Sequence, residues 1–431
     1  METLRVANGR VLRPSHDVER ADVLIDRTEG TVLEVGDVSG GDAVLDADGG
    51  VVMPGLVNAH THVAMTLLRG FAEDEPLEAW LNDVVWPVEA ELEPADVRAG
   101  ARLGVAEMIR SGITAFADMY FEVEETAAVV DEAGLRASLG HTAITVGKEP
   151  DAAHADMERS LETAAAVDGR ADGRIQATVQ PHSTSTVGTD YLEAHVPTAR
   201  EAGHPLHYHT NETEGEVAEL VEATGKRPIV YADDLDMLGP GDTLAHCNHV
   251  DDREIELLAE RGVTVAHNPA ANMKVASGVA PVRELLDAGV RVALGTDGPA
   301  SNNDLDLFDE MCDAALLAKI DTGRADAIPA STVVDMATKH GAAALGIDSG
   351  RIEPGANADL IVVDTAEPKF SPGHDPISDL VYTANGNDVR HTVCDGTVLM
   401  RDRELLTIDA ERAKREAADR AERLFEAADV A

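Results

Sequence analysis

The chain alternates short apolar β-like runs with helical stretches, and an ionisable residue lies at the end of each run. Its middle part contains eight candidate strands, which end near His60, Asp118, His141, His182, His209, His246, His267 and Asp297. The helical stretches between them include residues 95–111, 152–167, 189–202, 252–261 and 304–320. Strands that alternate with helices pair in parallel through right-handed crossovers. Eight such units predict an α/β fold, a (β/α)8 TIM barrel, whose active face lies at the carboxyl ends of the strands.

The two ends of the chain predict a second domain, because 431 residues exceed what one barrel needs. Residues 1–55 and 350–407 contain further β-like segments separated by Gly and Asp turns. We expect these segments to form two halves of one small β-sandwich, with the barrel over residues 56–349. Residues 408–431 predict a charged surface helix with a narrow apolar stripe.

The formal net charge of −45 is spread along the chain rather than gathered in blocks. This composition predicts a solvated, halophilic surface on which strong screening removes most of the self-repulsion. It excludes nucleic-acid binding through a basic patch.

The three cysteines are odd in number and scattered, which predicts a reducing compartment without a disulfide framework. The first residues lack a signal pattern, and no apolar run is long enough to span a bilayer. We expect a cytoplasmic homo-oligomer that binds a small molecule and neither a membrane nor nucleic acid.

Five strand-end residues predict a metal centre. His60 and His62 point to the same side of their strand, because side chains alternate, and can chelate one ion. His209, His246 and Asp297 end three later strands. Histidines with a carboxylate suit Zn²⁺ and are poor ligands for Mg²⁺ or Ca²⁺. The pattern is typical of a metal-dependent hydrolase.

Neighbouring histidines compete for two of these positions. His207 shares a strand face with His209 but lies one layer deeper, which favours a packed barrel residue. Glu212, three residues after His209, places a carboxylate just beyond the strand end. His246 ends its apolar run directly, whereas His249 falls in the following loop.

Two further features stay open at this level. His267 is balanced between lining the site and supporting it from behind. Phe71, Trp80 and Trp86 could be core residues, but aromatic residues form only 3% of the chain. Three of them between the first strand and its helix favour a lid over an apolar, planar ligand.

Several sequence blocks resemble the amidohydrolase superfamily, in its deaminase and chlorohydrolase branch. They are PGLVNAHTHVAMTLLRG, HYHTNETEGEV, LAHCNHV, VAHNPAANMKVASG, LGTDGPASNN and GRIEPGANADLIVVD. The subgroup they resemble most deaminates 5′-methylthioadenosine and S-adenosylhomocysteine. The resemblance implies one divalent ion, usually zinc, held by His60, His62, His209 and Asp297. The fourth strand carries no lysine that could bridge two ions, which indicates a mononuclear centre.

The resemblance also implies a mechanism and substrate contacts. An ion held mainly by neutral imidazoles lowers the pKa of its water toward neutrality. Glu212 would protonate the adenine ring at N1, Asp297 would accept the water proton, and His246 would orient the water and stabilise the adduct. The products would be the inosine analogue and ammonia. Substrate contacts are expected from Glu89 (to the ribose hydroxyls), His182, Trp80 and His141.

The 5′ end of the nucleoside is where this chain departs from the pattern. Related enzymes that accept S-adenosylhomocysteine place arginines near the end of strand three, where this chain has His141 and no Arg from 137 to 158. Lys148 is the only fixed cation nearby, and it lacks the planar fork of Arg. We therefore expect a preference for neutral 5′ groups.

Two alternatives remain. The enzyme could act on another amino- or halo-substituted heteroaromatic ring, such as guanine, 8-oxoguanine or a triazine. Against this, Glu212 favours ring protonation and Glu89 favours a sugar diol. The chain could also be a scaffold without activity, but it keeps a full ligand set.

Overall fold

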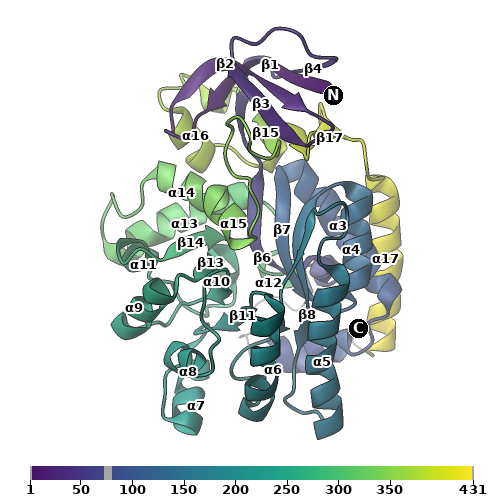
Figure 1. Cartoon of the computed structure of the whole chain (residues 1–431), viewed down its shortest axis with the longest axis vertical. Coiled ribbons are helices and arrows are strands. Elements are labelled where there is room, and N and C mark those ends of the chain that lie inside the picture. The colour runs from purple at the N-terminus through teal and green to yellow at the C-terminus, as the bar shows by residue number, and fades with distance from the viewer. Residues whose placement is uncertain (1, 72–79, 430–431) are drawn as a thin grey trace.

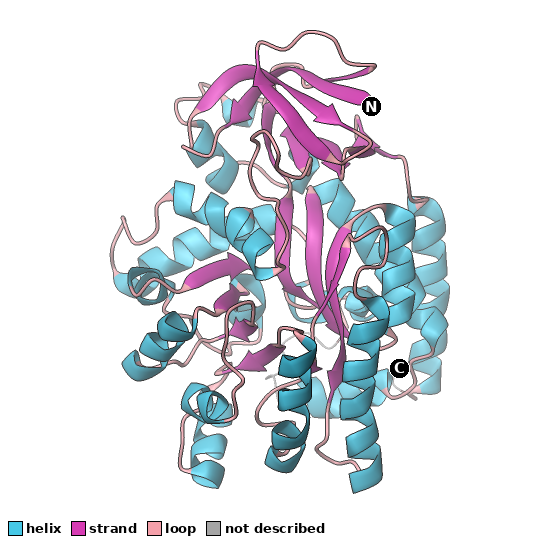
Figure 2. Ribbon diagram, viewed as in Figure 1, coloured by secondary structure: helices cyan, strands magenta, loops and turns pink. Residues whose placement is uncertain are grey.

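The computed structural model describes residues 2–71 and 80–429 of the chain. A barrel of strands occupies the middle of the molecule, and helices cover its outer surface (Figure 2). A β domain sits at one end of the barrel, at the top of Figure 1.

The barrel is built from nine strand segments that pair in parallel. They are β6 (Leu56–Thr61), β7 (Ile113–Tyr120), β8 (Arg136–Ala143), β9 (Ile175–Ala177), β10 (Gln180–Pro181), β11 (His207–Thr210), β12 (Thr243–His246), β13 (Thr264–His267) and β14 (Arg291–Leu294). β9 and β10 both pair with β8 and together form the fourth strand. Bridges Thr61–Asp297, Val179–Leu206 and Ser183–His209 join the two arcs of strands. The predicted (β/α)8 barrel is confirmed.

The helices that follow the strands cover the barrel. They are α3 (Pro94–Ser111), α4 (Val123–Ala133), α5 (Pro150–Val167), α6 (Thr189–Ala202), α7 (Glu214–Thr224), α8 (Pro228–Asp234), α9 (Asp252–Arg261), α10 (Pro269–Lys274), α11 (Val282–Asp287), α12 (Pro299–Asn302), α13 (Leu307–Thr322), α14 (Ala330–Ala337) and α15 (Lys339–Ala344). Each of the five predicted helical stretches overlaps one of them. The bounds follow local chemistry: α9 begins with a capping box between Asp251 and Glu254 and ends at Gly262, which has a left-handed backbone.

Both ends of the chain contribute to one nine-stranded sheet. Its strands are β1 (Thr3–Leu12), β2 (Val18–Asp26), β3 (Thr31–Gly36), β4 (Ala43–Asp46), β5 (Val51–Pro54), β15 (Leu360–Val363), β16 (Val389–Cys394), β17 (Thr397–Arg401) and β18 (Glu404–Leu405). Antiparallel pairing of β5 with β15 connects the two halves. An additional β domain was predicted, and its two halves are hydrogen-bonded into a continuous sheet. The boundaries at residues 55, 349 and 407 remain predictions.

The last helix, α17 (Ala410–Ala427), lies beside α3 (Figure 1). Its buried residues Ala413, Ala417 and Leu424 form the narrow stripe expected from the sequence. Arg102 on α3 donates to Glu416 on α17 at 2.7 Å. Within the described ranges, no helix combines the length and apolarity that crossing a bilayer requires.

Candidate metal centre

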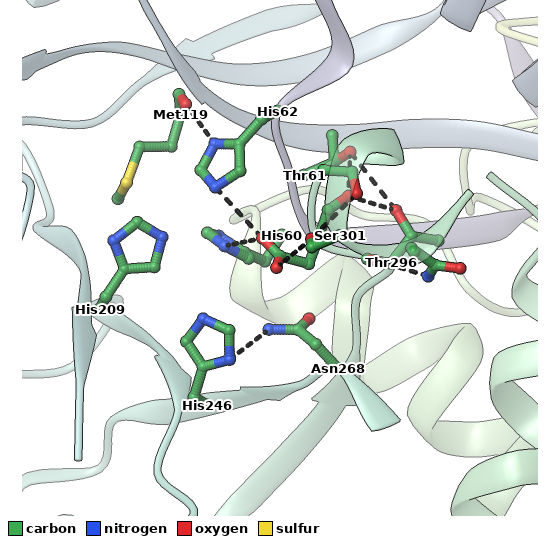
Figure 3. A network of polar contacts seen from close by, with 12 residues as sticks. His60, Thr61, His62, Met119, His209, His246, Asn268, Thr296 and Ser301 are labelled. Atoms are coloured by element: carbon green, nitrogen blue, oxygen red, sulfur yellow. Dashed lines mark hydrogen bonds and ion pairs between the residues drawn. The ribbon is translucent and has the colours of Figure 1, made fainter. Parts of the chain in front are cut away.

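Four side chains meet at the carboxyl ends of the barrel strands. They are His60 and His62 at the end of β6, His209 on β11 and Asp297 after β14. Figure 3 shows the three histidines turned toward one another. Each offers one ligand atom, and these atoms lie within 4.8 Å of one another. The Nε2 atoms of His60 and His62 lie 3.3 and 3.2 Å from Asp297 Oδ1. The structure thus brings together the four residues predicted as metal ligands.

Hydrogen bonds behind the histidines aim their Nε2 atoms at this point. His62 Nδ1 donates to the Met119 carbonyl at 2.5 Å, and His209 Nδ1 donates to the His182 carbonyl at 2.9 Å. A carbonyl only accepts, so each Nδ1 carries a hydrogen, and in the neutral ring each Nε2 keeps a lone pair. Burial alone would lower the pKa of His62, but Asp297 outweighs it and raises this pKa to about 9, so a metal ion displaces a proton from its Nε2. His60 Nδ1 lies 3.0 Å from Nε2 of His207, the buried residue predicted to lie one layer deeper.

Asp297 is held by its backbone and by a neighbour. Its φ of 58° lies in the left-handed region, which is uncommon for a residue other than glycine. Ser301 donates to its Oδ2 at 2.7 Å, so Oδ1 faces the histidines. Burial alone would raise the pKa of Asp297, but His60 and His62 outweigh it and hold this pKa well below its usual range. The carboxylate is therefore ionised at neutral pH.

The ligand set fits a divalent metal ion. Nε2 of His60 is fully buried and has no hydrogen-bond partner. Burial lowers the pKa of His60 to about 4, which favours the neutral imidazole that binds metal. Three imidazoles with one carboxylate suit Zn²⁺ or a similar ion.

Glu212 and His246 face each other beside the ligands. Glu212 Oε2 lies 3.7 Å from His246 Nε2. Burial raises the pKa of Glu212 to about 7, so the carboxyl can hold a proton near neutral pH. His246 has a φ of 74°, a second left-handed residue at a strand end. Both residues line the same cavity as the ligands His62, His209 and Asp297.

Apolar side chains line this cavity, and three predicted substrate contacts, Trp80, Glu89 and His182, lie in it. Its apolar lining consists of Met65, Trp80, Leu81, Val85, Trp86, Met119, Phe121 and Ile144. Glu89 and His182 also line it. Oε1 of Glu89 is buried without a hydrogen-bond partner among residues 2–71 and 80–429, and burial raises the pKa of Glu89 to about 7 against a hydrogen bond from Tyr120. The walls suit a planar apolar ring, and Glu89 offers an open polar contact.

His141 is placed differently from its prediction. It is not among the residues lining the cavity; the next residue, Thr142, is. Alternation along β8 puts His141 on the same face as Leu139 and Ala143, which pack in the apolar core. Its Nε2 lies 3.0 Å from Asp156 on α5. Contact between His141 and the nucleoside therefore finds no support in this geometry.

The structure bears on three alternatives left open by the sequence: His246 or His249, the place of His267, and the role of the three aromatic residues. His249 Nε2 donates to the Ser277 carbonyl at 2.6 Å, away from the cavity that His246 lines. His267 is buried, and it does not line this cavity. Phe71 packs on Phe425 of α17 with ring centroids 4.4 Å apart, while Trp80 and Trp86 line the cavity. The rest of the expected lid, residues 72–79, lies outside the described residues.

Several site residues were not singled out from the sequence. Asp118 accepts from the Val63 backbone at 2.7 Å, which holds the chain directly after His62. Tyr120, Thr142 and Ser301 line the cavity. The sequence signal for Asp118 as a site residue is its position near the end of an apolar run, which it shares with the ligands.

Comparison with known proteins places the chain in a family. The model of the amidohydrolase family matches residues 51–399. The chain belongs to the amidohydrolase family. Together with the four-residue ligand group, this membership confirms the prediction of a divalent metal centre.

Individual relatives are similar over almost the whole chain. The 5-methylthioadenosine/S-adenosylhomocysteine deaminase of Haloarcula marismortui is 57% identical, over 99% of this chain and 100% of its own. The 5'-deoxyadenosine deaminase of Methanosarcina mazei is 46% identical, over 95% and 94%. Among solved structures, an adenosine deaminase from Xanthomonas campestris with bound zinc superposes with a TM-score of 0.92. It is 35% identical over 98% of both chains.

Proposed function

We propose that this amidohydrolase is a zinc-dependent deaminase of adenine nucleosides, such as 5′-methylthioadenosine, 5′-deoxyadenosine and adenosine. It replaces the 6-amino group by oxygen and releases ammonia. The named activities of the relatives support this assignment. The observation that carries it is one cavity with a metal-ligand group, a carboxyl of raised pKa and an apolar wall.

The residues around the cavity divide the chemical work. When bound, the ion lowers the pKa of a water molecule so that it can attack at neutral pH. Glu212 supplies a proton to ring nitrogen N1, because attack at C6 is unfavourable while the ring stays neutral. Asp297, which is ionised and is itself one of the four ligands, accepts the proton of the attacking water and later passes it to the departing ammonia. His246 orients that water and stabilises the tetrahedral adduct.

Other residues that line the cavity recognise the substrate. The unpartnered Oε1 of Glu89 accepts from the ribose hydroxyls, which satisfies a buried polar atom. Trp80 and Trp86 pack on the nucleoside, and His182 contacts it from beside His209; the rings of the two histidines lie 4.6 Å apart.

A panel of ring substrates tests the proposal. Ammonia release should occur with adenosine, 5′-methylthioadenosine and 5′-deoxyadenosine, and the product should have the absorption spectrum of the inosine analogue. Guanine, 8-oxoguanine and an aminotriazine are the comparison substrates. Higher efficiency with any of these three would replace the nucleoside assignment.

We also propose that the chain works in the cytoplasm as a homo-oligomer. The three cysteines, Cys247, Cys312 and Cys394, are free, in keeping with a reducing compartment. The mass of the protein in molar KCl, measured by light scattering, tests the oligomeric state.

A further inference from the structure

Two buried asparagines behind His246 have no part in the mechanism described so far. Asn248 follows β12, and Asn272 lies on α10; their exposed fractions are 5% and 1%. Asn272 Oδ1 lies 2.8 Å from His246 Nδ1. Asn272 Nδ2 donates to Asn248 Oδ1 at 2.8 Å, and Asn248 Nδ2 donates to the Glu212 carbonyl at 3.0 Å. An unbroken chain of hydrogen bonds thus runs from His246 to the backbone of Glu212.

The Glu212 carbonyl fixes the direction of every bond in this chain. A backbone carbonyl only accepts, so Asn248 must turn its amide nitrogen toward Glu212 and its oxygen toward Asn272. Asn272 must then turn its nitrogen toward Asn248 and its oxygen toward His246. That oxygen can only accept, so the hydrogen of the neutral imidazole sits on Nδ1. Nε2 of His246 is left with a lone pair.

Two further contacts bear on this assignment. The Ser277 hydroxyl lies 3.4 Å from Asn272 Oδ1 and 3.3 Å from Asn248 Nδ2, and a hydroxyl can donate to the first and accept from the second. Asn268 Nδ2 lies 3.4 Å from His246 Nδ1 (Figure 3). If the Asn268 nitrogen donated to Nδ1, Nδ1 would have to be unprotonated. Two acceptors, Nδ1 and the Asn272 oxygen, would then face each other at 2.8 Å, which is unfavourable.

The 2.8 Å contact with Asn272 determines the tautomer, because it is shorter than the 3.4 Å contact with Asn268. Oδ1 of Asn268 is buried and has no hydrogen-bond partner among the described residues, so no contact of this oxygen fixes which way the amide is turned. The oxygen and nitrogen of a side-chain amide have nearly the same shape, so the Asn268 amide can rotate by 180°. Its oxygen then lies beside His246 Nδ1 and is a second acceptor for the Nδ1 hydrogen. The hydrogen on Nδ1 is therefore compatible with the neighbours of Nδ1. On the other side of the ring, Nε2 lies 3.7 Å from Glu212 Oε2, and its lone pair is compatible with the protonated carboxyl of Glu212.

We propose that Asn272 and Asn248 are positioning residues that hold His246 in the Nδ1–H tautomer, so that Nε2 accepts a hydrogen bond on the cavity side. This inference rests on the proposed function, in which His246 orients the attacking water. An acceptor at Nε2 holds that water, and then the hydroxyl group of the tetrahedral adduct, through one hydrogen, and it leaves the water oxygen free to face the ring. Because the same chain ends on Glu212, it also fixes the distance between the two groups.

The tautomer can be measured directly on the metal-loaded full chain with ¹⁵N-labelled histidine. The His246 signals are identified by their loss in His246→Gln. We expect Nδ1 to be protonated and Nε2 unprotonated in the wild type, and the hydrogen to move toward Nε2 in Asn272→Leu. A hydrogen on Nε2 in the wild type, or an unchanged tautomer in Asn272→Leu, would overturn the proposal. No substrate is needed, so this result does not depend on the proposed function.

Kinetics give the second readout. Asn272→Leu should lower kcat for adenosine roughly 10–100-fold, the usual effect of removing an orienting partner, with KM and metal content little changed. Asn272→Asp keeps an acceptor at Nδ1 and should retain more of kcat. Thr392→Val is the matched control: it removes one buried hydrogen bond, to the Ile109 carbonyl at 2.8 Å, in the β domain.

Equal losses in the Leu and Asp variants, or wild-type kcat in Asn272→Leu, would overturn the positioning role. If the wild type deaminates no adenine nucleoside while the tautomer shifts as expected, the proposed function fails and the hydrogen-bond chain stands.

Discussion

The preference for the 5′ substituent is a sharp prediction of this structure. A pocket that shares Trp86, Glu89, Phe121 and Ile144 with the cavity is also lined by Ala90, Val146 and Lys148, and we call it the cavity mouth. Lys148 Nζ already binds Asp156 Oδ2 at 2.7 Å. The carboxylate of S-adenosylhomocysteine would therefore meet apolar side chains and a cation whose charge is already balanced.

The size of the effect follows from the missing contact. A hydrogen bond to a charged group contributes roughly 1.5–3 kcal/mol, which corresponds to about 10–150-fold in kcat/KM. Molar salt screens charges, so the lower part of this range applies there. We expect 5′-methylthioadenosine, 5′-deoxyadenosine and adenosine to exceed S-adenosylhomocysteine by this margin.

A single substitution should reverse the preference. Val146 is 56% exposed at the cavity mouth. Val146→Arg supplies the planar fork that binds a carboxylate bidentately and should raise kcat/KM for S-adenosylhomocysteine selectively. Val146→Met, of similar length but uncharged, is the control. The assay compares kcat/KM for the four nucleosides in the same KCl concentration. Equal or better efficiency of the wild type with S-adenosylhomocysteine would refute the reasoning.

Three further predictions concern the acid, the surface and a buried carboxylate. Glu212→Gln should keep its metal and bind nucleoside but lose roughly 10²–10⁴-fold in kcat, whereas Glu219→Gln, at the outer rim, should not; near-normal turnover of Glu212→Gln contradicts the role. The melting temperature should rise from low to molar KCl as repulsion within a chain of net charge −45 is screened; an unchanged value contradicts the halophilic interpretation. Burial alone would raise the pKa of Asp156, but hydrogen bonds from His141, Lys148 and Ile144 lower it to about 2 from 3.8. This carboxylate should therefore contribute about 2 kcal/mol to the free energy of unfolding above pH 4, and this contribution is lost as the pH falls toward 2. Urea unfolding of the wild type and of Asp156→Asn at pH 4 and near pH 2 measures it. A difference in unfolding free energy that does not change with pH contradicts the assignment.

The sequence was sufficient for the barrel and for the ligand group because both depend on short-range periodicity. A two-residue repeat puts His60 and His62 on one strand face, and parallel strands bring their carboxyl ends to one rim. The same reasoning separated His246 from His249, because the former ends the apolar run itself.

The orientation of His141 could not be predicted from its position near the end of a strand. The strand continues to Ala143, and its pattern of alternate residues turns His141 toward α5 and Asp156. Counting the alternation from Leu139 would have favoured Thr142 as the lining residue.

The hydrogen-bond chain behind His246 could not be predicted from the sequence. Asn248 lies 24 residues from Asn272 and 36 from Glu212, and their contacts depend on how α10 packs against the loops after β11 and β12. Nothing in a local pattern distinguishes these asparagines from ordinary loop residues.

The measurement that tests the account most directly is a metal titration of the metal-free chain with 5′-methylthioadenosine as substrate. Ammonia release should rise with added Zn²⁺ and reach its plateau at one ion per chain, because one group of four ligands holds the ion. His209→Ala should neither bind zinc tightly nor respond. A plateau at two ions per chain, full activity without metal, or no deamination at any metal content would contradict a mononuclear adenine-nucleoside deaminase.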